Sequence, residues 1–244
     1  MKKKCTAILL AAGAGRRMES NVAKQYMLLA DKPVIWYGLQ AFKQSAVIDD
    51  VVLVVGKGEI PYVRKEIVEK YGFSKVSAIT EGGAERYLSV QKALAVMEHH
   101  DGYVFIHDGA RPLITEKIIE DTYRAAEAYG ACCAAVPVKD TIKIADENGF
   151  AAKTPDRSRL FAVQTPQVFE TALITEAYRL LNALNEGGTA PAEKSVCITD
   201  DAMVVETMLH HPVKLVEASY ENIKITTPED MEVAERFLER RQKQ

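Results

Sequence analysis

The sequence predicts an α/β fold built on a mostly parallel, twisted sheet, and three observations support this prediction. Short apolar runs bounded by polar residues or glycine recur along the chain, as buried strands do, at residues 5–12, 50–55, 76–80, 103–106 and 131–136. The segments between them show helical spacing, with Val63, Ile67 and Tyr71 each four residues apart. The third observation is that a β-hairpin pattern interrupts this alternation of strands and helices once. Strands that alternate with amphipathic helices pair in parallel through right-handed crossovers, and helices cover both faces of the sheet.

Length and composition exclude several classes of protein. A chain of 244 residues with 48% hydrophobic content is long and apolar enough to bury a full core. Its net charge of −3 gives no global basic field for duplex nucleic acid. No apolar run approaches the roughly 20 residues that span a bilayer. The four cysteines show neither a disulfide framework nor zinc-ligand spacing. We expect a cytoplasmic protein with no nucleic-acid or membrane partner, folded as a single domain over residues 1–244.

The N-terminal segment has two interpretations. The lysines at positions 2–4, followed by an apolar stretch that reaches Ala14, imitate a secretory signal peptide. We favour a buried parallel strand that enters a glycine turn, because Arg16 and Arg17 follow immediately and the strand-turn-helix pattern recurs downstream.

That turn, Gly13-Ala-Gly-Arg-Arg17, is the first candidate anion site. Glycines let the backbone approach a phosphate closely and present its N–H groups, and an arginine guanidinium binds phosphate oxygens bidentately. Two known motifs do not fit: a dinucleotide fingerprint requires a third glycine where this chain has Met18, and a Walker A loop requires Gly-Lys-Ser/Thr. The turn is therefore either a triphosphate clamp completed by Lys24 or a tight turn with solvated arginines.

Two further strand ends carry candidate ligand contacts, because ligands of open parallel sheets sit outside the carboxyl ends of the strands. Gly82 and Gly83 lead from a strand to a helix N-terminus, a geometry that favours anions but also occurs in ordinary capped loops. Asp108 ends an apolar strand, where it is placed to bind Mg²⁺ or a sugar hydroxyl. The alternative for Asp108 is a turn in which its carboxylate binds backbone N–H groups.

The α/β alternation breaks after Val138. Residues 141–144 and 150–153 flank Asp146-Glu-Asn-Gly149, the strongest hairpin pattern in the chain. A lone hairpin has too little apolar surface to be stable, so we expect an arm at about residues 138–160 that packs on a second subunit. The α/β pattern then resumes with a helix near residues 170–181, a loop at 187–192, a helix from about Thr199, a strand at 213–216 and a last helix capped by Thr227.

Eight short motifs occur in order along nearly the whole chain, and together they are far more specific than any one of them. They are Ala11-Ala-Gly-Ala-Gly-Arg-Arg-Met18, Lys24-Gln-Tyr26, Gly82-Gly83 with Glu85-Arg86, His107-Asp-Gly-Ala-Arg-Pro112, Pro137-Val-Lys-Asp-Thr141, Gln164-Thr-Pro-Gln167, Thr199-Asp-Asp-Ala202 and Asn222-Ile-Lys-Ile-Thr-Thr-Pro-Glu-Asp230. The combination closely resembles the family of 2-C-methyl-D-erythritol 4-phosphate cytidylyltransferases, enzymes of the non-mevalonate isoprenoid pathway. The resemblance implies a Rossmann-like nucleotidyltransferase fold with a projecting β-hairpin arm, a homodimer formed through that arm, and transfer of CMP from CTP to a sugar-alcohol phosphate with Mg²⁺ as cofactor.

The resemblance also implies roles for individual residues. Arg17 and Lys24 match the pair that stabilises the transition state, and Arg157 and Lys224 match the pair that positions the acceptor. Contacts to CTP are expected from Ala11, Ala12, Gly13, Ala14, Gly15, Gly82, Gly83, Ser89 and Asp108, with Asp108 also a metal ligand beside the CTP phosphates. Contacts to the acceptor are expected from Arg111, Thr141, Thr165, Thr199 and Thr226, with Thr141 and Arg157 reaching across the dimer. Many relatives carry Asp or Thr where this chain has Ala84, which bears on nucleotide affinity.

The expected reaction agrees with the residue types present. An acceptor phosphate, whose second pKa is about 6, is largely ionised at neutral pH, so it needs no general base. It needs cations that bring two polyanions together. One alternative is a ribitol 5-phosphate cytidylyltransferase, which Ala11-Ala-Gly13 and residues 137–141 disfavour. Another is a catalytically silent nucleotide-binding subunit, which the presence of Arg17, Lys24 and Lys224 disfavours.

Overall fold

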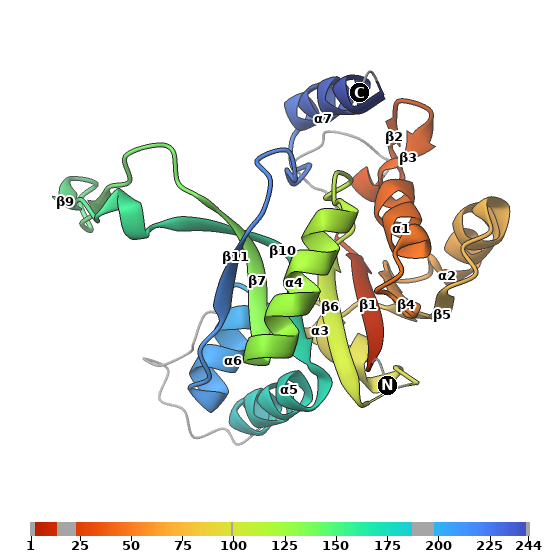
Figure 1. Cartoon of the computed structure of the whole chain (residues 1–244), viewed down its shortest axis with the longest axis horizontal. Coiled ribbons are helices and arrows are strands. Elements are labelled where there is room, and N and C mark those ends of the chain that lie inside the picture. The colour runs from red at the N-terminus through yellow and green to blue at the C-terminus, as the bar shows by residue number, and fades with distance from the viewer. Residues whose placement is uncertain (1–2, 14–22, 99, 187–197, 243–244) are drawn as a thin grey trace.

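A computed structural model describes residues 3–13, 23–98, 100–186 and 198–242, which form a seven-stranded sheet with helices on both faces (Figure 1). The strand order is β11-β7-β10-β6-β1-β4-β5. Every neighbouring pair is parallel except the two made by β10, which runs antiparallel to β6 and β7. The mostly parallel sheet is therefore confirmed. The strands are β1 (Lys4–Ala11), β4 (Asp50–Val55), β5 (Val76–Glu81), β6 (Gly102–Asp108), β7 (Ala131–Pro137), β10 (Phe161–Glu170) and β11 (Lys214–Glu217).

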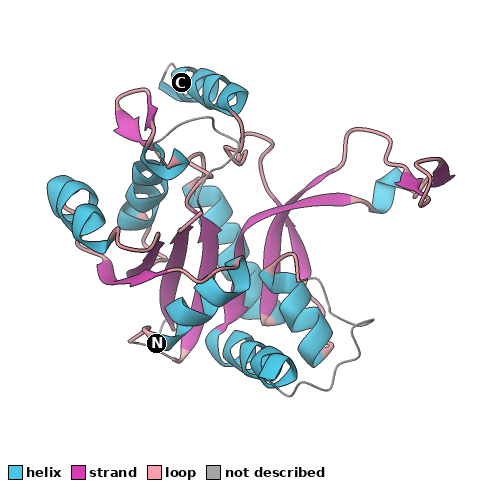
Figure 2. Ribbon diagram, turned by 180° about the vertical axis from the view of Figure 1, so that it is seen from behind, coloured by secondary structure: helices cyan, strands magenta, loops and turns pink. Residues whose placement is uncertain are grey.

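Helices cover the two faces of the sheet in separate groups (Figures 1 and 2). The first face carries α1 (Val34–Gln44), α2 (Ile60–Val63) with its π-helical continuation η3 (Arg64–Glu69), and α4 (Glu116–Tyr129). The second face carries α3 (Arg86–Ala95), α5 (Thr171–Glu186) and α6 (Asp201–Leu209). Outside these groups lie the 3-10 helices η2 (Lys24–Tyr26) and η4 (Arg157–Arg159), the short strands β2 (Leu28–Leu29), β3 (Lys32–Pro33), β8 (Ile144–Ala145) and β9 (Ala151–Lys153), and the last helix α7 (Pro228–Gln242).

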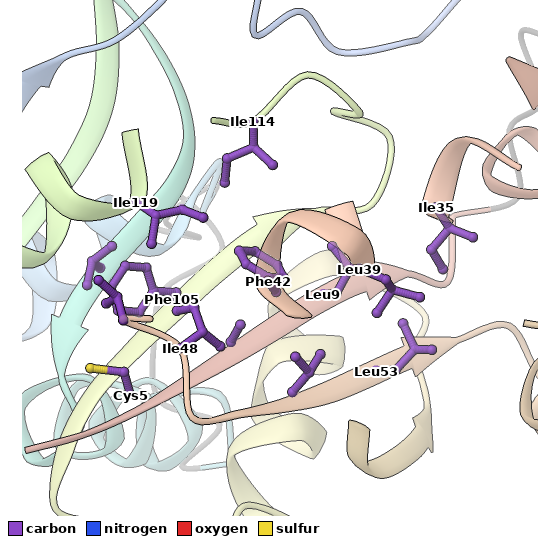
Figure 3. Packing of buried hydrophobic residues seen from close by; sticks show 14 of the residues in the cluster. Cys5, Leu9, Ile35, Leu39, Phe42, Ile48, Leu53, Phe105, Ile114 and Ile119 are labelled. Carbon is purple, nitrogen blue, oxygen red and sulfur yellow. The ribbon is translucent and has the colours of Figure 1, made fainter. Parts of the chain in front are cut away.

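The core follows from the alternation of side chains along the strands. Successive residues of a strand point to opposite faces, so Leu9 and Leu53 pack with α1 on one face (Figure 3), whereas Ile8 and Val52 pack with α3 on the other. Both faces of these strands are buried, which explains their nearly continuous apolar sequences.

The N-terminal segment forms the strand that its sequence predicts. β1 lies between β6 and β4 in the middle of the sheet, and Cys5 is buried. Cys132 and Cys133 are also buried free thiols, in β7. None of the described helices has the length and apolar character needed to cross a lipid bilayer.

Two features differ from the sequence-based expectation. Strand β10 was not expected, because Gln164, Thr165 and Gln167 interrupt its apolar pattern and Pro166 cannot donate a ladder hydrogen bond. The structure accommodates the proline at a register shift between Val163 and Gln167. The strand expected at residues 141–144 was wrong in extent, since β8 keeps only Ile144–Ala145. The turn itself is confirmed, with Gly149 at φ +85°.

The hairpin β8–β9 lies at the end of an arm, defined as residues 138–160, that projects from the body of the molecule (Figure 1). Its side chains from Lys139 to Thr154 are exposed. The loop expected at residues 187–192 lies outside the described part of the chain.

A small third core lies at the carboxyl edge of the sheet. Helix α7 packs there against Leu29 of β2, Val34 of α1, and Leu113 and Ile225 from two separate loops. Thr227 begins α7, and the Asp230 carboxylate accepts its backbone N–H at 2.9 Å, which is one half of a capping box. The last helix therefore ties together the loops that border the candidate site.

Candidate active site

Two adjoining clefts open at the carboxyl ends of β1 and β6, with volumes of about 350 and 240 Å³. Arg86, Asp108 and Lys224 line both clefts. The first cleft is otherwise lined by Leu10, Ala11, Ala12, Gly13, Lys24, Gln25, Gly83, Ala84, Glu85, Ser89 and Ala110. The second is otherwise lined by Arg111, Val163, Gln164, Thr165, Gln167, Thr199 and Asp200. Ligands bound in the two clefts would meet the same three charged side chains.

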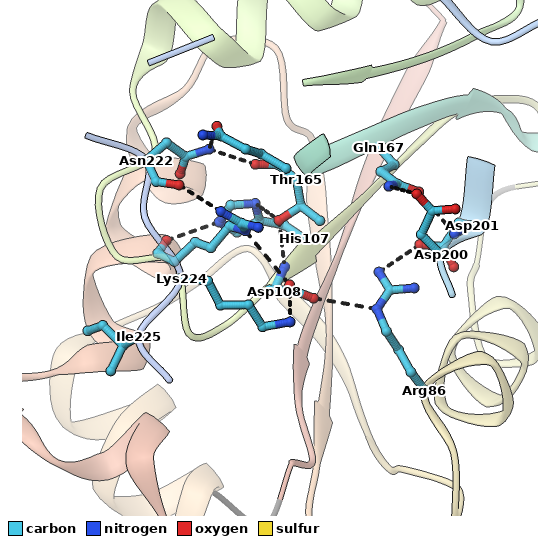
Figure 4. Close-up of polar contacts among 12 residues, drawn as sticks. Arg86, His107, Asp108, Thr165, Gln167, Asp200, Asp201, Asn222, Lys224 and Ile225 are labelled. Carbon is cyan, nitrogen blue, oxygen red and sulfur yellow. Dashed lines mark hydrogen bonds and ion pairs between the residues drawn. The ribbon is translucent and has the colours of Figure 1, made fainter. Parts of the chain in front are cut away.

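Asp108, the last residue of β6, is the centre of this shared boundary (Figure 4). Its carboxylate lies 2.8 Å from the Lys224 ammonium, 3.5 Å from the Arg86 guanidinium and 3.8 Å from that of Arg111. Burial alone would raise the pKa of Asp108, but Arg86, Lys224 and Arg111 hold it well below its usual range. Asp108 is therefore ionised at neutral pH and keeps three cations from separate segments together.

Arg86 opens α3 and links Asp108 to a second buried carboxylate. Its guanidinium lies 2.7 Å from Asp201, whose other oxygen accepts a hydrogen bond from the Tyr178 hydroxyl at 2.7 Å. Burial opposes the charge on Arg86, yet Asp201 and Asp108 more than offset it and raise its pKa. Arg86 therefore has little freedom to move.

The charges around the boundary of the clefts balance. Arg86, Arg111 and Lys224 carry three positive charges beside the carboxylates of Asp108 and Asp201, and Asp200 adds a third carboxylate at the second cleft. The Nε–H of Arg111 is buried and makes no hydrogen bond within the described part of the chain. The guanidinium and ammonium groups that line the second cleft give it several N–H donors, which favour a ligand with oxygen acceptors.

A chain of hydrogen bonds holds the end of β6 in place. The Asp108 N–H donates to the Thr165 hydroxyl oxygen at 3.0 Å, and that hydroxyl lies 3.0 Å from His107 Nδ1. His107 Nε2 lies 3.1 Å from the Arg111 carbonyl, which can only accept, so Nε2 carries the proton and Nδ1 accepts from Thr165. Burial lowers the pKa of His107 to about 4, so the imidazole is neutral at physiological pH.

One wall of the first cleft is built from glycine backbone. A Cβ on Gly82 would meet the Ala12 methyl group closer than van der Waals contact and would lie 2.8 Å from Ser89 Oγ. The Gly83 N–H donates to Ser89 Oγ at 3.0 Å. These two positions require glycine because the strand end, the Ser89 side chain and the cleft floor approach one another closely.

Lys24 and Lys224 reach the clefts from opposite ends of the sequence. Lys24, in η2, donates its ammonium to the Ile225 carbonyl at 3.1 Å. Lys224 and Ile225 belong to the segment between β11 and α7, residues 218–227, which we name the strap. The Ile225 N–H donates to the Ala110 carbonyl at 2.8 Å, so the strap is fastened to the loop that follows Asp108.

The structure brings together most of the residues that the sequence predicts. The first cleft is lined by Ala11, Ala12, Gly13, Lys24, Gly83, Ser89, Asp108 and Lys224, with Gly82 packed directly behind it. The second cleft is lined by Arg111, Thr165 and Thr199.

The other candidates lie elsewhere. Thr141 and Arg157 lie on the arm, and Thr226 lines neither cleft because its hydroxyl binds Asp230. Ala14, Gly15 and Arg17 fall outside the described residues.

Sequence reasoning assigned no role to several residues that line the clefts. Arg86 and Gln164 were quoted only inside motifs, as were Gln167 and Asp200. Gln167 Oε1 accepts the N–H groups of Asp201 and Ala202, and its amide donates to Asp200 at 2.9 Å. The polar residues within an otherwise apolar segment were the sequence signal that could have shown that β10 contributes side chains to the site.

The clefts lack the residues for an all-protein metal centre. Among the described residues no group of three or more His, Cys, Asp or Glu side chains is placed to hold a metal ion. What the clefts provide is several cations, backbone N–H groups and the ionised Asp108 carboxylate at their boundary, a set suited to holding two phosphorylated ligands side by side.

Comparison with known proteins agrees with this arrangement. A family model described as 2-C-methyl-D-erythritol 4-phosphate cytidylyltransferase, IspD, matches residues 5–240. Proteins of that name from Lachnoclostridium phytofermentans and Lachnospira eligens are 48% identical over 240 residues and 49% identical over 235 residues. The alignments cover 98% and 96% of this chain and 98% of each relative.

Solved structures show the same similarity. The 4-diphosphocytidyl-2C-methyl-D-erythritol synthase from Anaerococcus prevotii superposes with a TM-score of 0.81 at 31% identity, covering 97% of this chain and 96% of that one. The 2-C-methyl-D-erythritol 4-phosphate cytidylyltransferase from Thermus thermophilus superposes with a TM-score of 0.71 at 28% identity, covering 95% and 98%.

The buried imidazole of His107 predicts a pH dependence of stability. Its pKa is about 4 in the folded chain and near 6.5 when unfolded, so between these values the unfolded chain binds a proton that the folded chain does not. The unfolding free energy should therefore fall on acidification through this window, by up to about 1.4 kcal/mol per pH unit from His107. Asp108 adds little slope above about pH 5, because its folded pKa is lowered and its contribution is lost as the pH falls through its ordinary value of 3.8.

Urea unfolding of the parent and of His107→Gln across this window measures the effect. Glutamine keeps an N–H donor for the Arg111 carbonyl but takes up no proton. The variant should be less stable and should show the shallower dependence on pH. Equal slopes in the two proteins would show that His107 does not stay neutral.

Proposed function

The chain belongs to the 2-C-methyl-D-erythritol 4-phosphate cytidylyltransferase family, and we propose that it transfers CMP from CTP to 2-C-methyl-D-erythritol 4-phosphate with release of pyrophosphate. It is thus a nucleotidyltransferase of isoprenoid precursor biosynthesis. The observation that carries the proposal is the pair of clefts that share Arg86, Asp108 and Lys224, because the two substrates must react where their sites meet.

In this proposal CTP occupies the first cleft and the acceptor phosphate occupies the second. The glycine wall, with the Gly83 N–H and Ser89, lies along the nucleotide. Lys224 lines both clefts and is the cation that a phosphate in either would meet. Arg111 lines the second cleft and is a further cation for the acceptor phosphate there.

The acceptor phosphate attacks the α-phosphorus of CTP as an anion, so no side chain has to remove a proton. Charge accumulates on the α-phosphate and on the departing pyrophosphate. Lys24, held at the Ile225 carbonyl, is placed to neutralise that charge at the first cleft. We assign the same role to Arg17 from its sequence motif alone. Orientation and electrostatic stabilisation by fixed cations supply the catalysis.

We propose Mg²⁺ as the cofactor. The donor set fits an ion that enters with the triphosphate, since Mg²⁺ in nucleotide enzymes is bound by one or two carboxylates and by phosphate oxygens. Asp108 is the ionised carboxylate that would hold it, beside the CTP phosphates. The ion would neutralise part of the triphosphate charge.

We also propose a homodimer formed through the arm, in the cytoplasm. Phe150 and Ile144 are 73% and 49% exposed on the arm, more apolar surface than an isolated hairpin can keep in water. Thr141 and Arg157 lie on the arm away from their own clefts, as expected of residues that complete the partner's acceptor site. The buried free thiols fit a reducing compartment.

The direct test of the proposed function is pyrophosphate release from CTP, with methylerythritol phosphate and ribitol 5-phosphate assayed in parallel. Turnover should require CTP and should be at least about tenfold faster with methylerythritol phosphate, because an analogue that leaves a buried polar group of the site unpaired is rejected by this factor or more. Preferential use of ribitol 5-phosphate would move the chain to the alternative acceptor.

Removal of one cation tests the assignment of Lys24. Lys24→Ala should lower kcat by about a hundredfold or more, while the KM for CTP changes less, because the charge develops in the transition state. Lys117→Ala, an exposed lysine on α4, is the control and should retain the parental kcat. A Lys24→Ala kcat within twofold of the parent would refute the role.

Mixed dimers test whether Arg157 acts across the interface. Arg157→Ala and Lys224→Ala should each be nearly inactive alone. After subunit exchange, half of the dimers are mixed and each contains one intact site, so about a quarter of parental activity should return. If Arg157 served its own subunit, mixing would restore nothing.

A further inference from the structure

The strap that carries Lys224 crosses the base of the arm. It is hydrogen-bonded to both strands that lead into the arm, β7 and β10. On the β10 side, Gln164 donates to the Ser219 carbonyl at 3.1 Å, and the Asn222 amide donates to Gln164 Oε1 and the Thr165 carbonyl, each at 2.9 Å. On the β7 side, Tyr220 donates its hydroxyl to the Pro137 carbonyl at 2.7 Å. The strap has no regular secondary structure, so its position depends on these contacts together with the hydrogen bond from the Ile225 N–H to the Ala110 carbonyl.

Tyr220 contacts the arm in a second way. The Lys139 ammonium lies 3.7 Å from the centre of the Tyr220 ring, a close cation–π contact. Pro137 is the last residue of β7, and Lys139 belongs to the arm. The Tyr220 side chain therefore contacts residues on both sides of the point where the arm leaves the sheet. Four residues after Tyr220 comes Lys224, whose ammonium binds Asp108.

Lys139 connects this contact to the arm's own cation. Its carbonyl accepts a hydrogen bond from the Arg157 guanidinium at 2.9 Å. Contacts therefore run without a break from Arg157 through Lys139 and Tyr220 to the strap of Lys224. In the proposed dimer Lys224 serves its own acceptor cleft and Arg157 serves that of the partner.

We propose that Tyr220 is a positioning residue for the acceptor phosphate. It fixes the strap to the base of the arm, so that Lys224 and Arg157, the two cations assigned to the acceptor, keep a set position relative to the sheet. Tyr220 is 43% exposed and lines neither cleft, so it acts through these cations and not by touching substrate. The inference rests on the proposed function.

Steady-state kinetics of Tyr220→Phe and Tyr220→Ala in the full-length protein test the proposal. Phenylalanine removes only the hydroxyl that binds Pro137, whereas alanine also removes the ring under Lys139. The KM for methylerythritol phosphate should rise about threefold in the first variant and about tenfold in the second, because small misplacement of a binding group costs this much or more. The KM for CTP should rise by a smaller factor, because the glycine wall of the first cleft does not depend on the strap.

Tyr129→Ala is the matched control. Tyr129 is also an exposed tyrosine, 55% accessible, with a lysine ammonium 5.5 Å from its ring, but it lies at the end of α4 and lines neither cleft. This variant should keep both KM values. Thermal unfolding of all variants confirms that each is folded.

The proposal is overturned if Tyr220→Phe keeps the parental KM for the acceptor, or if the KM values for both substrates rise by the same factor in either variant. Tyr220→Phe decides the matter alone if the alanine variant fails to fold. The parent protein is assayed before any variant is compared. If it does not release pyrophosphate with these substrates, the proposed function is refuted and not the role of Tyr220.

Discussion

The arrangement of the site depends on one buried interaction, the pairing of the Asp108 carboxylate with cations from three separate segments. Arg86 comes from the start of α3, Arg111 from the loop after β6, and Lys224 from the strap. Cations this close would repel one another without a shared counter-ion in a partly buried site. The carboxylate keeps them together at the boundary of two clefts, where their N–H donors face phosphate ligands.

The fold places this pairing where the mechanism needs it. Asp108 ends a strand whose neighbour β1 carries the glycine turn, so the nucleotide side of the site follows from parallel pairing. The antiparallel strand β10 then brings Thr165 and Gln167 to the same edge and continues into the arm. One strand thus supplies the acceptor cleft and supports the segment proposed to complete the partner's site. Helix α7 closes the arrangement by packing on the loops of Leu29, Leu113 and Ile225.

The sequence predicted those parts of the site that local patterns encode. The parallel strands, the glycine pair Gly82-Gly83 and Asp108 at a strand end are recognisable because each lies within a short stretch of sequence. Strand β10 was missed because Pro166 and its polar neighbours break the apolar pattern that marks a strand. The pairing of Arg86 with Asp201 could not be predicted, because the partners lie far apart in sequence and meet only when α3 and α6 pack on the same face of the sheet.

The central claim is that Asp108 organises both substrate sites through its cations, and the kinetics of Asp108→Asn with each substrate varied in turn test it most directly. Asparagine has the same shape without the charge. The account predicts a folded protein whose kcat falls by about a hundredfold and whose KM values for CTP and for the acceptor both change, because the shared cations lose their counter-ion. A variant that altered only the KM for CTP, with parental kcat and acceptor KM, would contradict it.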